Sequence, residues 1–178
     1  MCGIVGKYNF NKELVSKALV KKMCDVITHR GPDDEGFCIN ENVGIGMRRL
    51  SIIDLEGGAQ PVFNEDKSLV IVFNGEIYNY KELQIKLGSL GHKFLTNSDT
   101  EVLIHAYEEY GVDFLQKING MFAIAILDIK KNELFIARDR IGIKPLYYYI
   151  SDNSFLFGSE IKCILEDESV ERILNREA

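Results

Sequence analysis

The segment Leu69-Val70-Ile71-Val72-Phe73 is apolar at every position, and a second run of this kind follows at Phe122-Ala123-Ile124-Ala125-Ile126-Leu127. Neighbouring side chains of a strand point to opposite faces of the sheet. A one-sided antiparallel sheet therefore alternates apolar and polar residues, whereas these runs predict strands that are covered on both faces. Two stacked antiparallel sheets with helices outside them satisfy this requirement.

The rest of the chain supplies strands and helices for such a stack. Further strands are expected at residues 3–8, 36–39 and 43–53, and hairpins join 122–129 to 133–138 and 146–150 to 154–157. Helical periodicity marks residues 13–27, 80–90, 99–110 and 161–165. Ser98 precedes the third of these helices and Glu101 stands three residues later, which is a capping-box pattern. Because the helices do not follow every strand, a doubly wound parallel sheet is disfavoured.

Composition and charge exclude several classes of function. The 178 residues are 46% hydrophobic, which suits one domain with a substantial core. The formal net charge of −6 gives no basic surface for nucleic acid. The longest purely apolar run, Met121 to Leu127, is far too short for a membrane span, and no signal peptide is visible. We therefore expect a cytoplasmic protein without nucleic-acid or membrane partners.

The cysteines and histidines show no metal-binding pattern. Cysteines stand at positions 2, 24, 38 and 163 and histidines at 29, 92 and 105, with neither metal-finger nor helical ligand spacing. A disulfide framework is not expected in a cytosolic chain of this size. Cys24 and Cys163 fall in expected helices and are interpreted as small core residues. We predict no metal site.

The N-terminus, Met1-Cys2-Gly3-Ile4, offers a different chemistry. Removal of Met1 by an aminopeptidase would leave a thiol and a free α-amine on Cys2. The α-amine has an ordinary pKa of about 7.7–8.0, so it is close to neutral and can act as the base for the thiol. Taken alone, Cys2 is interpreted more simply as a small residue at the head of a strand.

Three further strings carry groups that could hold a small charged ligand. Arg48-Arg49 ends an expected strand with guanidinium forks suited to a carboxylate, although a solvated strand edge is the simpler interpretation. Asn74-Gly75-Glu76 follows the strand 69–73 directly. Asn-Gly is a hairpin-turn signal. A side-chain amide beside a glycine N–H can also form an oxyanion hole. Asp99 at a helix start either complements the helix dipole or pairs with a ligand ammonium.

Seven strings of this chain, the four described above and three others, together resemble the glutaminase domain of class II glutamine amidotransferases. The resemblance is greatest to the glutaminase domain of glutamine-hydrolysing asparagine synthetases. The strings occur in family order and cover nearly the whole chain, and the arginine string favours the asparagine synthetase subfamily. They are Met1-Cys2-Gly3-Ile4, His29-Arg30-Gly31-Pro32-Asp33, Arg49-Leu50-Ser51-Ile52-Ile53-Asp54, Phe73-Asn74-Gly75-Glu76-Ile77-Tyr78-Asn79, Ser98-Asp99-Thr100-Glu101, Ala137-Arg138-Asp139-Arg140-Ile141-Gly142-Ile143-Lys144-Pro145-Leu146-Tyr147 and Gly158-Ser159-Glu160-Ile161-Lys162.

The resemblance implies a fold and a domain organisation. The fold is an α+β Ntn-hydrolase fold, a four-layer αββα sandwich of two stacked antiparallel sheets. Residues 1–165 would form the glutaminase domain, and residues 166–178 a charged C-terminal tail or connector to a missing synthetase domain.

The resemblance also implies the roles of the site residues. Cys2 would attack the side-chain amide of glutamine with its own α-amine as base, while the Asn74 side chain and the Gly75 N–H hold the oxyanion. Arg30 would brace the loop around Cys2. The substrate-binding residues are Arg49 for the α-carboxylate, Asp99 with the help of Glu76 for the α-ammonium, and Leu50, Ile52 and Ile53 as pocket lining.

The family resemblance does not extend to an ATP-binding site. A synthetase domain of this family carries a Ser-Gly-Gly-x-Asp-Ser loop, which is absent from these residues. No cofactor is therefore expected in this chain, and ATP and magnesium are expected only in a synthetase domain, attached or separate, that makes asparagine from aspartate. A homodimer is left open.

Three alternatives are weighed. The chain could be a stand-alone glutaminase subunit that feeds another acceptor, such as a sugar or a secondary metabolite. It could be a catalytically idle binding domain, which the presence of nucleophile, oxyanion pair, arginine and aspartate disfavours. It could be an Ntn hydrolase for another amide, which Arg49 and Asp99 disfavour because together they describe a free amino acid.

Overall fold

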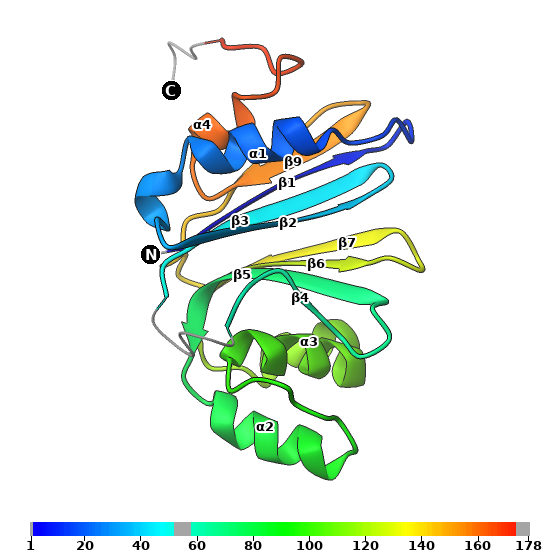
Figure 1. Cartoon of the computed structure of the whole chain (residues 1–178), viewed down its shortest axis with the longest axis vertical. Helices are drawn as coiled ribbons and strands as arrows, with labels where there is room; N and C mark the ends of the chain where they lie inside the picture. Colours follow the sequence, from blue (N-terminus) through cyan, green and yellow to red (C-terminus); the bar gives the residue numbers. More distant parts are fainter. Residues whose placement is uncertain (1, 52–57, 174–178) are drawn as a thin grey trace.

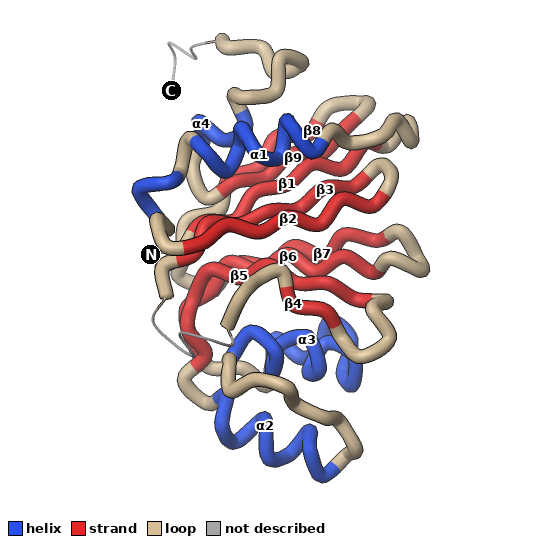
Figure 2. Tube along the Cα trace, in the orientation of Figure 1, coloured by secondary structure: helices blue, strands red, loops and turns tan. Residues whose placement is uncertain are grey.

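Two antiparallel sheets lie face to face, and helices cover the outer face of each (Figure 1). The computed structural model describes residues 2–51 and 58–173. Within these residues the layers follow one another as helix, sheet, sheet, helix, which the tube view shows by colour (Figure 2). The fold predicted from the two apolar runs is therefore confirmed.

The first sheet joins the N-terminal strand to strands from the end of the chain. Its strands run in the order β2-β3-β1-β9-β8 with every neighbouring pair antiparallel. Their bounds are β1 Gly3–Asn9, β2 Asp34–Asn40, β3 Val43–Arg49, β8 Tyr147–Ile150 and β9 Ser154–Gly158. The second sheet has the order β4-β5-β6-β7, with β4 Val62–Phe63, β5 Leu69–Ile77, β6 Gly120–Asp128 and β7 Glu133–Arg138.

The helices divide between the two outer faces. On the five-stranded sheet lie α1 (Lys17–Asp25) and α4 (Ile161–Ile164) (Figure 1). On the four-stranded sheet lies α3 (Asp99–Tyr110), with α2 (Tyr80–Ser89) outside it (Figure 1). Two 3-10 helices, η1 (Thr28–Arg30) and η2 (Gly111–Gln116), follow α1 and α3.

The strand β5 shows how the apolar pattern builds these layers. Its residues Ile71 and Phe73 pack in a buried cluster with side chains of α2 and α3. The alternate residues Val70 and Val72 pack between the sheets, against Ile4 of β1. Burial of a valine or isoleucine side chain contributes about 1.5–3 kcal/mol. Both faces of β5 therefore stabilise the stack, as its unbroken apolar run predicts.

A third buried cluster joins the five-stranded sheet to its helices. It contains Val5 of β1, Val20 of α1 and the thiols of Cys24 and Cys163. Both cysteines are buried, and burial raises the pKa of Cys24 to about 12 and that of Cys163 to about 11. Their interpretation as inert core residues is confirmed.

Several boundaries differ from those predicted. Helix α1 begins at Lys17 and not at residue 13, because Val15 N–H bonds to the Glu41 carbonyl and holds this stretch outside the helix. Strand β5 does not end before Asn74 but continues to Ile77. The two-residue strand β4 and the 3-10 helices are too short to leave a periodic signal. The end of the predicted strand 43–53 lies partly outside the described residues.

At the N-terminus of α3, one of the two hydrogen bonds that a capping box predicts is present. Ser98 Oγ accepts a hydrogen bond from Thr100 N–H, so Ser98 is the N-cap. Glu101 does not return to the Ser98 N–H, which bonds to Thr96 Oγ1 at 3.2 Å. The Glu101 carboxylate instead accepts from the N–H groups of Leu95 (2.8 Å) and Thr96 (2.7 Å) and ties the preceding loop to the helix.

The described part of the C-terminal tail lies against the five-stranded sheet and its helices. Asp167 is buried and forms an ion pair with Lys7 of β1. Val170 is buried in the same cluster as Cys24.

Across residues 2–51 and 58–173, every helix is too short or too polar to cross a bilayer.

Candidate active site

The pairing of β1 with β3 brings Cys2 next to Leu50. Gly3 lies opposite Arg48 in the register of the two strands, so the residues just outside them also meet. The Leu50 N–H donates to Cys2 Sγ at 3.3 Å, and Cys2 Sγ lies 3.6 Å from the Leu50 carbonyl oxygen. Cys2 is half-buried, and main-chain atoms hold its sulfur at the end of an inner strand.

The loop after α1 supports Cys2 from its main-chain side. Arg30 Nε donates to the Cys2 carbonyl oxygen at 3.0 Å, as expected for a bracing residue. Arg30 Nη1 also donates to Glu160 at 3.2 Å. Burial acts to raise the pKa of Glu160, but hydrogen bonds from His29, Lys162 and Arg30 outweigh it and hold that pKa at about 2. The ionised Glu160 therefore keeps Arg30 in position.

Asp33 in the same loop fixes Leu50. Its N–H bonds to the Arg49 carbonyl at 3.1 Å, and its carboxylate accepts from the Ser51 N–H at 2.8 Å. Asp33 thus holds the chain on both sides of the residue that contacts the Cys2 sulfur. A Cβ on Gly31 would lie 2.4 Å from the Arg48 carbonyl carbon, so only glycine lets this loop pack against β3.

A hollow with a volume of about 80 Å³ begins at Cys2 and opens to solvent. Every predicted site residue that the structure describes lines it, whereas Ile52 and Ile53 lie outside the described residues. The lining residues are Cys2, Arg49, Leu50, Gly58, Gln60, Phe73, Asn74, Gly75, Glu76, Ser98, Asp99, Thr100, Met121 and Lys144.

Asn74 presents an unpaired donor to this hollow. It shares a pleat face with Val70 and Val72, between the sheets, and is only 1% exposed. Among the described residues its Nδ2 has no hydrogen-bond partner. A buried donor without an acceptor costs about 1–3 kcal/mol, so the site is built to receive an oxygen that the chain does not supply.

Gly75 lies within the sheet and not in a turn after it. It pairs with Phe122 of β6, and a Cβ at this position would lie 2.2 Å from the Met121 carbonyl oxygen. The hairpin interpretation of Asn-Gly is therefore wrong, because β5 runs on through both residues. Glycine is required here so that the strand can carry Asn74 into the hollow at close approach to β6.

The two charged residues come from different layers, Arg49 from β3 and Asp99 from the first turn of α3. Both are buried. Asp99 Oδ2 accepts from the Ile77 N–H at 3.1 Å. Burial raises the pKa of Asp99 to about 6, and the nearby Glu76 carboxylate adds to this effect. A cationic ligand group at this position would stabilise the ionised form.

Lys144 is a site residue that the sequence analysis missed. It is 6% exposed and lines the hollow. Asp139 positions it by accepting from the N–H groups of Lys144 (3.0 Å), Ile143 (2.8 Å) and Phe122 (3.2 Å). Burial opposes ionisation of Asp139, but these N–H groups lower its pKa. The sequence signals for Lys144 were its place in the string 137–147 and its position between apolar Ile143 and a proline.

Gln60 was also missed and has no signal in the sequence. Its Oε1 accepts from the Phe73 N–H at 2.7 Å, and its Nε2 donates to the Phe73 carbonyl and the Thr100 hydroxyl, both at 3.2 Å. The side chain therefore continues the sheet beside β5 and ties that strand to the start of α3, on the wall that carries Asn74 and Asp99.

Two stacked antiparallel sheets with helices on both outer faces are the architecture of the Ntn-hydrolase fold. Solved structures share the fold. A glutamine phosphoribosylpyrophosphate amidotransferase from B. subtilis matches 92% of this chain and 43% of its own, with a TM-score of 0.77 and 20% identity. A structure described as the allosteric regulatory enzyme of purine biosynthesis gives a TM-score of 0.78, at 21% identity over 93% of this chain and 43% of its own.

The family follows from sequence similarity. A family model described as a glutamine amidotransferase domain matches residues 1–178, so this chain belongs to the glutamine amidotransferase domain family. Asparagine synthetase [glutamine-hydrolyzing] 2 of Bacillus subtilis is 47% identical over 98% of this chain and 24% of its own length. An asparagine synthetase [glutamine-hydrolyzing] of Zea mays is 41% identical over 94% of this chain and 28% of its own.

A putative asparagine synthetase [glutamine-hydrolyzing] 2 of Methanocaldococcus jannaschii is 43% identical over 97% of this chain and 36% of its own. The chain thus spans about a quarter to a third of the length of these relatives. The family resemblance predicted from the seven strings is confirmed.

Proposed function

We propose that this domain hydrolyses glutamine to glutamate and ammonia with Cys2 as nucleophile. One arrangement carries the proposal: the Cys2 sulfur and the buried, unpaired Asn74 Nδ2 line the same hollow as Arg49 and Asp99. A nucleophile and an oxyanion donor define acyl transfer, and one buried group of each charge suits the two charges of a free amino acid.

The proposed reaction requires the free α-amine of residue 2. The amine takes the thiol proton, and the sulfur attacks the side-chain carbonyl carbon of glutamine. The oxyanion accepts hydrogen bonds from Asn74 Nδ2 and the Gly75 N–H. Collapse breaks the C–N bond, the proton passes to the leaving nitrogen, and ammonia departs from a glutamyl thioester. Water then attacks the thioester, which releases glutamate and restores the thiol.

We propose the following assignments for substrate binding. The Arg49 guanidinium binds the α-carboxylate, and Asp99, helped by Glu76, binds the α-ammonium. Leu50, Ile52 and Ile53 line the pocket. Because an analogue that lacks one of these charges would lose the matching ion pair, the two residues would select a complete amino acid.

We further propose that the ammonia passes to an ATP-pyrophosphatase synthetase domain, attached or separate, which makes asparagine from aspartate with ATP and magnesium in the cytoplasm. The support is that the relatives are named glutamine-hydrolysing asparagine synthetases and that this chain matches only 24% to 36% of their length. In this proposal residues 1–165 are the glutaminase domain, and residues 166–178 lead toward the synthetase domain.

A diazoketone analogue of glutamine tests the proposal directly. The intact mass of the chain is measured before and after incubation, and the adduct is mapped by peptide sequencing. The untreated mass shows whether Met1 has been removed. One adduct on Cys2 supports the nucleophile and a formed glutamine pocket. No adduct on a chain that begins with Cys2 would contradict the proposal and favour an idle binding domain.

A further inference from the structure

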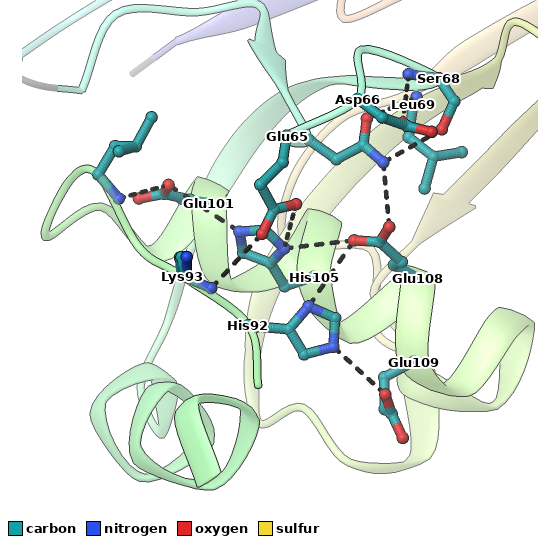
Figure 3. A network of polar contacts seen from close by, with 12 residues as sticks. Glu65, Asp66, Ser68, Leu69, His92, Lys93, Glu101, His105, Glu108 and Glu109 are labelled. Atoms are coloured by element: carbon teal, nitrogen blue, oxygen red, sulfur yellow. Dashed lines mark hydrogen bonds and ion pairs between the residues drawn. The ribbon is translucent and has the colours of Figure 1, made fainter. Parts of the chain in front are cut away.

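A second polar cluster lies on the opposite side of the four-stranded sheet from Cys2. It joins Glu65 of the β4–β5 turn, His92 of the α2–α3 loop and His105 of α3 (Figure 3). One ligand atom from each residue lies within 4.8 Å of one from each of the others. The histidines are 13 positions apart, so their proximity arises from the fold and not from a sequence motif.

Glu108 of α3 completes the group. Its Oε2 lies 3.4 Å from His105 Nδ1 and 3.7 Å from His92 Nδ1. Glu65 Oε2 lies 3.7 Å from His105 Nδ1 (Figure 3). Ligand atoms about 2.0–2.1 Å from a tetrahedral zinc ion are about 3.3–3.4 Å from one another. The three observed separations, 3.4 to 3.7 Å, match the edges of that tetrahedron or exceed them by up to about 0.4 Å.

Both carboxylates already have one oxygen fixed and the other directed at the histidines. Asn64 Nδ2 donates to Glu108 Oε1 at 3.1 Å, which leaves Oε2 facing the rings. The Lys93 N–H donates to Glu65 Oε1 at 3.4 Å, which leaves Oε2 facing His105. The polar atoms that point at the centre of the group are therefore preorganised.

The second ring nitrogen of each histidine, Nε2, also lies near a carboxylate. His92 Nε2 lies 3.2 Å from Glu109 Oε2, and His105 Nε2 lies 3.9 Å from Glu101 Oε1 (Figure 3). A metal-binding histidine characteristically donates its other ring N–H to a carboxylate, which fixes the tautomer and orients the ring. The His92 ring thus has the support that Nδ1 ligation needs, and His105 Nε2 lies within ion-pair distance of the Glu101 carboxylate.

The histidines of this group are buried, whereas its carboxylates are partly exposed to solvent. The side chain of His105 is 2% exposed and that of His92 is 12%, whereas Glu108 and Glu65 are 34% and 47% exposed. An ion could enter past the carboxylates and reach the buried imidazoles. Two carboxylates and two neutral imidazoles form a donor set that suits zinc and related divalent transition metals.

We propose that Glu65, His92, His105 and Glu108 form a structural site for a divalent transition-metal ion of the zinc class. Four protein ligands make a closed site, which is characteristic of structural and not catalytic metals. The ion would join the β4–β5 turn, the α2–α3 loop and α3. Helix α3 begins with Asp99, so the site would stiffen the element that carries this pocket residue. The inference does not depend on glutamine hydrolysis.

The test is a zinc titration of the whole chain in a Cys2→Ala background, so that the reactive thiol does not bind metal. Isothermal titration calorimetry is expected to give one Zn²⁺ per chain, and Zn²⁺ is expected to raise the melting temperature. His92→Gln and Glu65→Gln should each weaken Zn²⁺ binding at least about tenfold. Glu65 is exposed, so its substitution leaves the fold intact.

Matched controls are His29→Gln and Glu82→Gln, which remove a histidine and an exposed glutamate elsewhere and should bind Zn²⁺ as the parent does. Co²⁺ in place of zinc should give the intense visible absorption of tetrahedral coordination. The absence of saturable one-to-one binding in the parent, or unchanged affinity in both His92→Gln and Glu65→Gln, would overturn the proposal.

Discussion

The Leu50 N–H donates to the Cys2 sulfur at 3.3 Å, across the end of the β1–β3 pair. These residues are 48 positions apart, and the register of β1 against β3 brings them together. Asp33 fixes the chain on both sides of Leu50, and Arg30 holds the Cys2 carbonyl. The loop after α1 therefore positions Cys2 without lining the hollow itself.

Removing the thiol should abolish the reaction. In the proposed mechanism Cys2→Ala leaves no group that can form the thioester, so we expect glutamine turnover to fall by at least about a thousandfold. Release of glutamate and ammonia is measured with purified protein. An unchanged melting temperature serves as the folding control. Residual turnover near the parent rate would refute Cys2 as the nucleophile.

Asn74→Ala should separate activity from stability. Loss of one oxyanion donor is expected to lower kcat about 10²- to 10³-fold with little change in KM. Because Asn74 Nδ2 has no partner among the described residues, its removal should leave the free energy of unfolding unchanged or slightly higher. Steady-state kinetics and urea unfolding are measured together, with Asn153→Ala on an exposed turn as the matched control. A large loss of stability with normal kcat would point to a structural role.

Asp99→Asn should weaken glutamine binding. The amide keeps the shape and can still accept from the Ile77 N–H, but it loses the charge that pairs with the α-ammonium. We expect KM for glutamine to rise at least about tenfold while kcat changes much less. Turnover at low glutamine concentration is the sensitive measurement. Unchanged turnover there would exclude this role for Asp99.

The raised pKa of Asp99 predicts how stability depends on pH. The folded-state pKa is about 6, above the ordinary value of 3.8 for an aspartate, so folding favours the protonated form. The favourable contribution of this group is complete below about pH 4 and is lost as the pH rises through about 6.

Asp99→Asn removes this dependence, so its stability relative to the parent should grow between pH about 4 and about 6, by on the order of 1–3 kcal/mol. Urea unfolding of both chains without glutamine checks the sign. A difference that does not vary with pH would show that Asp99 titrates normally.

Gly75→Ala should destabilise the domain. Its Cβ would meet the Met121 carbonyl oxygen at 2.2 Å, so β5 and β6 would have to separate. Overpacking of this kind costs about 1–3 kcal/mol, and the shift would also displace Asn74. Gly88→Ala in α2 is the matched control: nothing lies within 4 Å of its Cβ, and alanine should stabilise the helix by up to about 1 kcal/mol. Equal melting temperatures for the two variants would contradict this reasoning.

The stacked sheets and most residues of the hollow could be predicted from local sequence patterns. An apolar residue at every position of 69–73 can be satisfied only by cover on both faces, which is a property of the segment itself. Cys2, Arg49, Asn74 and Asp99 stand in strings whose order along the chain is characteristic of one family, and the structure places all four around one hollow.

Roles that depend on partners far apart in the sequence could be assigned only from the folded structure. Gln60 acts as a sheet edge because β5 and α3 meet there, and Lys144 enters the hollow because Asp139 turns its loop. His92 and His105 lack ligand spacing in the sequence, yet the α2–α3 connection places their rings 5.0 Å apart. The local pattern of apolar residues predicts which faces of a segment are buried. Contacts between side chains far apart in the sequence form only when the layers of the fold pack together.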